Sequence, residues 1–337
     1  MKSSYILVGD MHAVPEELDD CSKVIELIIR VAETEDHIRE VVFVGDQFHT
    51  HSVVRLEVLH WWKSAFRALK DAGLKVICMV GNHDQAGPGS QAHAMMAFQG
   101  EITIVDQPLV KSGVLFLPYY HTEAEFLEAV KAHVPTKDRF VEQHYPGTVV
   151  CHQTFDGSKF ENGFLATDGF DLNLVPQALL ISGHIHTPQE FGKVWYIGAP
   201  RWRSLSDANV DRAIWAVDFN ADGSLEDRRP YSTGDVCRQI KYVVDTPDSP
   251  VALPIDPRHQ WRIDIKGPPD WCQTRKLELQ AAGARIRCFP TQVSTQGRIR
   301  ESEGIGSAFQ TFLSSFQPKY GTSPERLSEM VKERLHV

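Results

Sequence analysis

Five short apolar runs of this sequence end directly in residues that can bind a metal ion. The run ends are Asp10-Met11-His12, Gly45-Asp46, Gly81-Asn82-His83-Asp84, Cys151-His152 and Gly183-His184-Ile185-His186. Each run is rich in Val, Ile and Leu, which is typical of a buried strand. Because open α/β sheets bind ligands at the carboxyl ends of their strands, the pattern predicts that these side chains converge at one sheet edge.

Strand-like runs alternate with helical patterns over the first two thirds of the chain. The expected strands are 5–9, 41–45, 75–80, 102–105, 114–117, 148–152, 178–182, 193–198 and 213–218. The expected helices, in which apolar residues recur at three-to-four spacing, are 16–35, 53–72 and 122–132. This alternation predicts an α/β layered fold.

Turn-forming residues near 219–235 predict a domain boundary. We expect one domain over 1–228, a second over 229–300 and closing helices within 301–337. The elements expected after the boundary are strands 238–246, 261–266 and 284–289, a helix 270–283, a polar loop 292–306, and helices 307–316 and 323–335.

The charge differs between the two parts of the chain. Residues 1–228 carry 19 Lys and Arg against 32 Asp and Glu, whereas residues 229–337 carry 16 against 12. The acidic part suits a domain whose carboxylates bind metal, and the mildly basic part is compatible with a polyanionic partner. Ordinary surface variation explains the difference equally well.

Several classes of protein are disfavoured by the sequence. No apolar run approaches the roughly 20 residues that span a bilayer, so we expect no membrane association. The apolar run after Met1 is too short for a signal-peptide core, which predicts a cytoplasmic protein. The six cysteines are scattered without a Cys-x-x-Cys pair, which disfavours a zinc ribbon or a disulfide framework.

The ligand residues divide into two predicted metal sites that share Asp46, whose carboxylate has two oxygens and can bridge two cations. In an extended segment residues i and i+2 point the same way, so Asp10 and His12 can reach one ion. The first set is Asp10, His12, Asp46 and His186, and the second is Asp46, Asn82, His152 and His184. Taken singly, such residues are also common as turn or capping aspartates and as core histidines.

These ligand sets predict the chemistry of phosphoester cleavage. Two ions roughly 3.5–4 Å apart form a clamp for in-line displacement at phosphorus. Mixed nitrogen and oxygen ligands without thiolate suit Mn²⁺, Fe or Zn²⁺ better than Ca²⁺. The adjacent His83 is expected to contact phosphate oxygens or protonate the leaving group, with Asp84 orienting its imidazole.

In this order, the motifs resemble those of the calcineurin-like metallophosphoesterase superfamily. The resemblance covers about residues 1–220 and implies a four-layer αββα sandwich with a dinuclear site. Gly45-Asp46-Gln47-Phe48-His49 is similar to the Gly-Asp-x-Phe-His motif of SbcD-type DNA repair nucleases. That resemblance implies that His49 assists phosphodiester cleavage beside His83, although His51 competes for the role.

The resemblance also implies partners and a DNA-binding surface. Residues 238–289 resemble a small α+β capping domain that helps to select DNA, and an SbcC-type ATPase would bind C-terminal helices within 307–335. A homodimer is expected, with the Trp61/Trp62 helix as a candidate interface. The expected DNA contacts are Arg201, Trp202, Arg203, Arg275, Lys276, Arg285, Arg287, Arg298 and Arg300. The arginines and the lysine would neutralise phosphates and Trp202 would stack on an unpaired base, unless these side chains are solvated or packed.

The leading interpretation is therefore a Mn²⁺-dependent DNA exonuclease and endonuclease subunit of an SbcCD-like recombination and repair complex. The alternative is a phosphodiesterase or phosphatase that acts on small molecules or proteins, since the same metals serve it equally well. A non-enzymatic scaffold is a third reading, disfavoured because no ligand position is lost.

Overall fold

The computed structural model describes residues 2–133, 147–176, 179–245 and 255–290, together with Ser323 and Arg326. The loop expected over 292–306, the helix expected over 307–316, Arg298 and Arg300 lie outside the described residues. The helix expected over 323–335 is described at those two single positions only.

Two six-stranded mixed sheets form the body of the molecule. The first is ordered β12 (Leu225–Ser232), β11 (Ala213–Phe219), β1 (Ser3–Val8), β2 (Glu40–Phe43), β3 (Lys75–Met79) and β4 (Thr103–Val105). The second is ordered β5 (Leu109–Lys111), β6 (Val114–Phe116), β7 (Thr148–Cys151), β8 (Leu179–Ser182), β10 (Val194–Tyr196) and β9 (Gln189–Phe191). Short 3-10 helices are η1 (Pro15–Glu17), η2 (Ala94–Phe98), η3 (Leu172–Leu174) and η4 (Leu205–Asp207).

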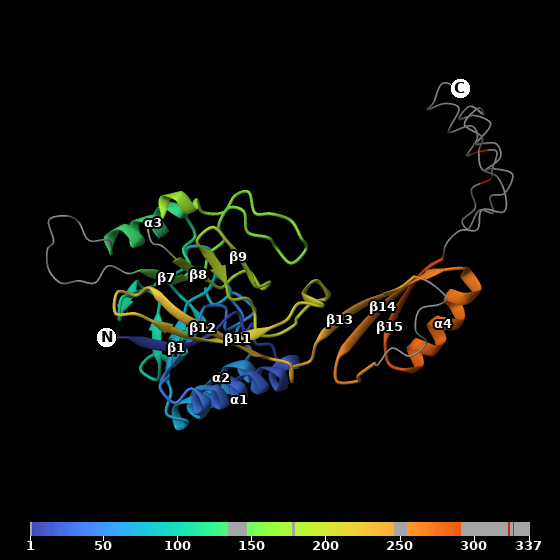
Figure 1. The fold of residues 1–337 in the computed structure, drawn as a ribbon, viewed down its shortest axis with the longest axis horizontal. Coiled ribbons are helices and arrows are strands. Elements are labelled where there is room, and N and C mark those ends of the chain that lie inside the picture. The colour runs from blue at the N-terminus through green and yellow to red at the C-terminus, as the bar shows by residue number, and fades with distance from the viewer. Residues whose placement is uncertain are drawn as a thin grey trace, which may run out of the picture.

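Helices cover the outer faces of both sheets (Figure 1). α1 (Leu18–Thr34) and α2 (Leu56–Asp71) pack on the first sheet, and α3 (Glu123–Ala132) packs on the second. The inner faces of the sheets share an apolar core, in which the Tyr5 and Phe116 rings meet edge to face at 5.6 Å. The four-layer αββα sandwich that the sequence predicted is confirmed.

The strand order explains why the ligand segments meet. β1, β2 and β3 are parallel neighbours in the first sheet, and β7 and β8 are parallel neighbours in the second. Their carboxyl ends therefore lie at the same end of the sandwich, where the chain leaves each strand into a loop. Each of the five segments with ligand residues is one of these loops.

One long strand of the first sheet was missed in the sequence. β12 pairs antiparallel with β11, and the two are joined by a turn in which the Asn220 amide donates to the Ser224 carbonyl at 2.9 Å. β12 is polar and contains Pro230, which suits the exposed edge of a sheet. The boundary expected after residue 228 falls inside this strand, so the connection to the next unit covers 233–238. The short strands β5 and β9 were missed as well.

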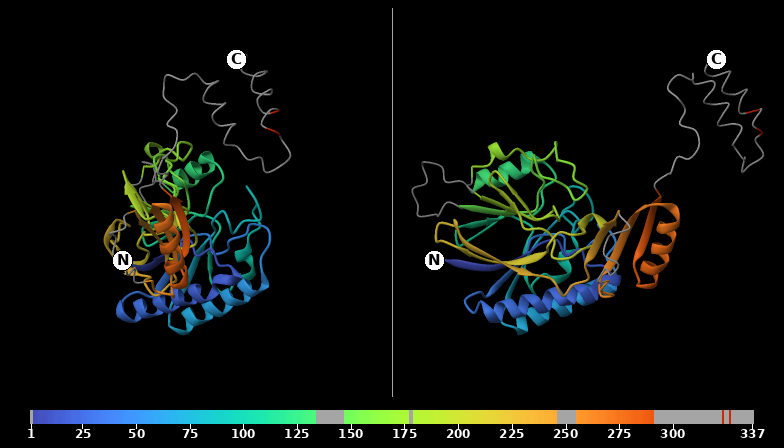
Figure 2. Two further views of the ribbon diagram at one scale, coloured as in Figure 1. Left: turned by 90° about the vertical axis from the view of Figure 1, so that its right-hand side faces the viewer. Right: turned by 45° about the vertical axis from the view of Figure 1, so that its right-hand side comes forward.

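A small α+β unit follows. β13 (Gln239–Val244), β14 (Gln260–Gly267) and β15 (Arg285–Pro290) form a parallel sheet, against which α4 (Pro269–Ala281) packs (Figure 2). Asn209 joins this unit to the larger one, because its side-chain amide donates to the Lys241 carbonyl at 2.7 Å and its side-chain oxygen accepts from the Lys241 amide. In the part of the chain that the structure describes, no helix has both the length and the apolar character to cross a bilayer.

Candidate metal centre

The predicted ligands lie together in two groups at the ends of the five strands. One group is Asp10, His12 and His186, and the other is Asp46, His152 and His184; within each group the ligand atoms lie within 4.8 Å of one another. Asp46 connects the groups, because its Oδ2 lies 3.5 Å from His12 Nε2 and 3.3 Å from His152 Nε2. Asn82 Oδ1 lies 2.9 Å from His184 Nδ1 and thus joins the second group.

The loops that carry these residues adopt unusual backbone conformations. His12, Asp46 and His184 have φ angles of 41°, 53° and 75°, in the left-handed region that non-glycine residues rarely enter. Gly81 is needed for close approach, since a Cβ there would lie 2.2 Å from Asp46 Oδ1. Backbone strain of this kind persists where the surrounding structure enforces it, and it is concentrated at functional sites.

Hydrogen bonds fix the tautomers of two histidines. His12 Nδ1 lies 3.3 Å from the Phe48 carbonyl, and His152 Nδ1 lies 2.7 Å from the Val44 carbonyl. Because a carbonyl oxygen only accepts, each Nδ1 carries the proton and donates it. With Nδ1 engaged in this way, Nε2 is the nitrogen that faces the site and would bind a metal ion, which is the arrangement found in metal-binding histidines.

The packing of the donor atoms fits a bound cation. The Nε2 atoms of His12 and His186 are only 3.0 Å apart, and Asp10 Oδ2 is buried without a hydrogen-bond partner. Burial raises the pKa of Asp10, and burial followed by the charge of His152 lowers the pKa of His184 to about 3. Imidazole nitrogens together with carboxylate and amide oxygens suit divalent transition metals.

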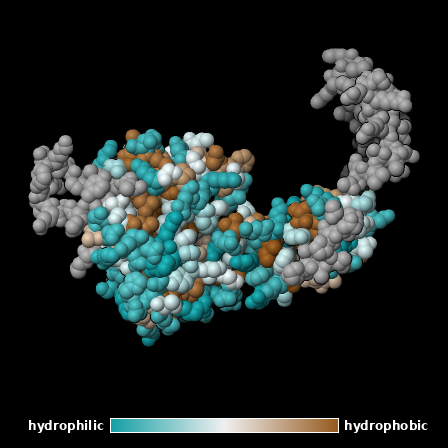
Figure 3. Space-filling model, viewed as in Figure 1, coloured by the Kyte–Doolittle hydropathy of each residue, from teal (hydrophilic) through white to brown (hydrophobic). Residues whose placement is uncertain are grey.

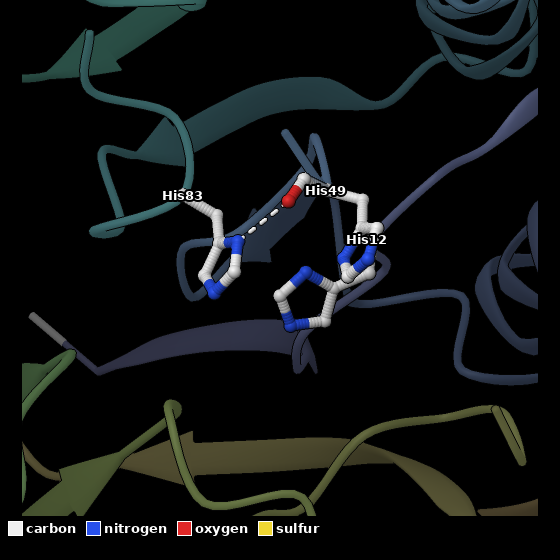
Figure 4. Close-up of side chains that lie close together, drawn as sticks. All are labelled: His12, His49 and His83. Atoms are coloured by element: carbon white, nitrogen blue, oxygen red, sulfur yellow. Dashed lines mark hydrogen bonds between the residues drawn. The ribbon is translucent and has the colours of Figure 1, made fainter. Parts of the chain in front are cut away.

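His49 and His83 form a further cluster with His12, which also belongs to the first ligand group (Figure 4). His83 Nδ1 donates to the His49 carbonyl at 2.6 Å, and the His83 ring lies parallel to the rings of both His49 and His51. His49 Nδ1 lies 2.8 Å from Arg203 Nη1. Burial and then the charge of Arg203 lower the pKa of His49 to about 4, so this imidazole is neutral at pH 7.

The role expected of Asp84 is corrected by its contacts. Asp84 was expected to orient the His83 ring, but the His83 ring donates to the His49 carbonyl instead. The Asp84 carboxylate accepts from the backbone amides of Phe48 and Gly81, each at 2.9 Å. It therefore joins the loop after β2 to the loop after β3 and holds the two loops in register.

Two of the expected DNA contacts, Arg201 and Trp202 in the loop after β10, are buried and cannot meet a substrate. Arg201 is 1% exposed and donates to the carbonyls of Met11 and His12, with an ion pair to Glu17. Trp202 lies in the core beneath the first sheet, so it cannot stack on a base. These two expectations are wrong, because the loop that carries them folds inward against the metal-site loops.

The other expected DNA contacts differ in exposure. Arg203 is half-buried beside His49, whereas Arg285 and Arg287 are exposed on β15. Arg287 forms two hydrogen bonds to the Asp264 carboxylate. Arg275 is buried and pairs with Glu278, so the DNA contact expected of it is also wrong. Lys276 is half-buried on α4.

One buried residue that supports the site was missed in the sequence. Arg212 is fully buried, pairs with Asp207 at 2.7 Å and donates to the backbone carbonyl of His186. With Arg201, it ties the 201–212 segment to loops of the first ligand group. Nothing near Arg212 in the sequence indicates this role, because the carbonyl that it holds belongs to His186, 26 residues earlier.

Comparison with known proteins identifies the class to which this site belongs. The sequence profile of the family described as calcineurin-like phosphoesterase matches residues 4–188, more than half of the chain. The chain therefore belongs to the calcineurin-like phosphoesterases, a family of hydrolases that bind divalent metals.

A curated relative extends the comparison. The chain is 24% identical over 189 residues to "Exonuclease subunit 1" of Enterobacteria phage T4, a match that covers 53% of this chain and 52% of that protein. The chain thus matches about half the length of that relative.

Proposed function

We propose that this chain is a DNA nuclease, cleaving phosphodiesters at a dinuclear centre that binds Mn²⁺. The observation that carries the proposal is the stacked pair of His83 and His49, which lies next to His12 and outside the two groups that contain the Asp10 or the Asp46 carboxylate. The similarity to an exonuclease subunit supports DNA as the substrate.

In this proposal, seven residues of the site bind the two metal ions, and His83 contacts the substrate. Asp10, His12, Asp46 and His186 would hold one ion, and Asp46, Asn82, His152 and His184 the other. When bound, the two ions supply positive charge for the phosphate and an activated water as nucleophile. The Nδ1 proton of His83 is committed to the His49 carbonyl, so its Nε2 remains for a phosphate oxygen or a leaving group.

A basic cavity supports a polyanionic substrate. It has a volume of about 420 Å³ and lies between η4 and the three-stranded sheet, where Arg203, Arg262, Arg285 and Arg287 line it and no acidic residue does. Arg203 reaches from this cavity to His49, which connects the cavity with the metal centre. From outside the lining, Asp264 pairs with Arg262 and Arg287, and Glu17 pairs with Arg203. The four arginines outnumber these two carboxylates, and the net positive charge suits the phosphates of a nucleic-acid backbone.

An SbcC-type ATPase partner and a homodimer belong to the same proposal, and the word "subunit" in the relative's description supports a complex. The candidate dimer interface on α2 is not supported by burial, since Trp62 is fully buried and Trp61 donates its indole N–H to Ser22. On the face shown in Figure 3, hydrophilic residues cover much of the surface and hydrophobic ones gather in separate patches.

The test is cleavage of linear duplex DNA labelled at the 3′ or the 5′ end, with and without Mn²⁺. We expect Mn²⁺-dependent shortening of the labelled strand by the native protein and none by Asp46→Asn. Release of label from one end first would give the polarity. Hydrolysis of small phosphodiesters or phosphoproteins with intact DNA would instead establish the alternative, a phosphodiesterase or phosphatase for such substrates.

A further inference from the structure

A second cavity, with a volume of about 310 Å³, is lined by acidic and uncharged polar residues, in contrast to the basic cavity. Its walls come from 85–93, from 106–107 after β4 and from 118–121 after β6. The 85–93 segment is closed on itself, because Gln85 and His93 form an antiparallel bridge and the Ala86 amide donates to the Ala92 carbonyl. Its volume is at the lower end of the about 300–1,000 Å³ typical of small-ligand sites.

Tyr119 forms the wall between this cavity and the metal centre. Its ring is stacked at 28° on the His184 ring, with 6.0 Å between centroids. The Tyr119 backbone amide donates to the carbonyl of Val80 at 2.8 Å. Val80 follows β3 directly and lies two residues before Asn82, so this hydrogen bond holds Tyr119 close to the Asn82 loop. A group that rests against Tyr119 therefore lies beside the second ligand group.

The lining of the cavity does not suit a phosphate. No lysine or arginine lines it among the described residues, and Asp106 and Glu125 contribute negative charge. The lining instead offers three carboxamides, Gln85, Gln91 and Gln107, next to tyrosine rings. Carboxamides both donate and accept, as the edge of a nucleobase does, and aromatic rings stack on its face.

A buried imidazole in the cavity wall provides an independent observation. His93 is 9% exposed, and its Nδ1 is buried without a hydrogen-bond partner. Its other nitrogen lies 3.4 Å from Asp106 Oδ2. Buried polar atoms in native proteins nearly always have partners, so this nitrogen is an unsatisfied hydrogen-bonding position just behind the cavity wall.

We propose that this cavity binds one unpaired nucleobase of the strand whose phosphate lies at the metal centre. The identity of the ligand as a nucleotide rests on the proposed nuclease function. Tyr119 provides the stacking surface, and Gln85 and Gln107 contact the base edge. The strand to be cut must then present an unpaired nucleotide at this position, which makes strand ends and single-stranded segments the preferred substrates.

The test is equilibrium binding of short single-stranded DNA with Mn²⁺, in a His83→Gln background in which cleavage is slow. A set of oligonucleotides carries one abasic residue at each position in turn. We expect one position at which loss of the base weakens binding about tenfold, within the range for a base stacked on an aromatic ring. The additional change Tyr119→Ala should abolish that dependence, and Tyr119→Phe should retain it.

Matched control variants distinguish base binding in the cavity from effects of residues outside it. Gln107→Ala should reduce the base preference, whereas Gln99→Ala, at an exposed glutamine outside the cavity, should leave it unchanged. If Tyr119→Ala weakened the binding of every oligonucleotide alike and left the positional dependence in place, Tyr119 would act through His184, and the proposal would be overturned. So would binding that shows no positional dependence. If binding depended on the abasic position but the native protein did not cleave DNA, the base-binding site would stand and the proposed nuclease function would be rejected.

Discussion

The imidazoles of His12 and His152 owe their orientation to one hydrogen bond each, to the carbonyls of Phe48 and Val44. These carbonyls belong to the segment that also holds Asp46, so one loop both supplies the central carboxylate and aims two of the nitrogens around it. At the scale of single residues, the site is therefore built by backbone atoms as much as by side chains.

Substitutions at Asp46 and His83 should separate metal binding from substrate handling. His83→Gln should lower kcat by about 10²–10⁴-fold, the usual contribution of a positioned acid or base, while two metal ions remain bound. Asp46→Asn should lose both bound metal and activity, since the shared carboxylate becomes a neutral amide. Metal analysis beside steady-state kinetics checks both, and loss of metal from His83→Gln would place that residue among the ligands instead.

Arg201 is expected to act on the metal site without contacting substrate. Its guanidinium reaches two carbonyls and Glu17 together, which a lysine ammonium cannot reproduce. Arg201→Lys should weaken Mn²⁺ binding by about 10–100-fold, as loss of a supporting partner of metal ligands usually does. Titration with Mn²⁺ measures this, and Arg228→Lys on exposed β12 serves as the control that should bind normally. Equal affinities in the two variants would contradict the assignment.

The clustering of the proposed ligands was predicted from the sequence because their spacing is local, with each segment set by a strand end. The roles of Asp84 and Arg201 were predicted wrongly because their partners are distant in the chain, and that of Trp202 because its ring packs into the core. Asp84 accepts from an amide 36 residues earlier, and Arg201 bonds to a carbonyl 190 residues earlier. No local pattern encodes such contacts, which depend on how the loops pack.

At the scale of elements, the sheets were predicted best where the strands are buried. β1, β2, β3, β7 and β8 are apolar runs that stand out in the sequence, whereas β12 reads LEDRRPYS and resembles a polar loop. An edge strand exposes one side to water, so it needs no continuous apolar run. Its place in the sheet is set by pairing with β11 instead.

Arg229 and Tyr231 on β12 hold the end of α1 through Glu35. Arg229 Nε and the Tyr231 hydroxyl donate to its carboxylate at 2.7 and 2.6 Å, and the hydrogen bonds from Arg229 and then Tyr231 lower the pKa of Glu35. Because the folded-state pKa is depressed, the stabilisation is present above the unfolded value of about 4.3 and is lost as the pH falls through the folded value.

We therefore expect Glu35→Gln to reduce the free energy of unfolding by about 1 kcal/mol at pH 6 and to converge with the native protein in acid. Urea unfolding at pH 6 and at pH 3 measures the difference. The exposed Glu33→Gln on the same helix should show no such pH dependence. A constant difference at both pH values would exclude the ion pair as its cause.

At the scale of the whole molecule, the two units have separate apolar cores joined through Asn209 and the connection over 233–238. Val236 in that connection still packs into the core of the larger unit. The residues of the candidate metal centre all lie in the larger unit, whereas residues of both units line the basic cavity.

A chain ending at Arg238 should therefore keep hydrolysing small phosphodiesters but bind DNA more weakly. Removal of Arg262, Arg285 and Arg287 takes three cavity arginines away, so the slope of log Kd against log salt should fall by about 0.7–0.9 for each phosphate that the protein no longer neutralises. Binding at several salt concentrations measures the slope. Unchanged DNA binding and cleavage would assign the substrate entirely to the larger unit.

The left-handed backbone at His12, Asp46 and His184 restricts which amino acids evolution can place there. Asn, Asp and His are the non-glycine residues that tolerate this conformation best, and all three can bind metal. The positions are thus restricted twice, once by φ and once by ligand chemistry. Glycine adopts the positive φ but has no side chain to bind metal, whereas glutamate can bind metal but does not favour the positive φ. Exchanges among Asp, Asn and His are therefore the most accessible route by which this site could change its metal.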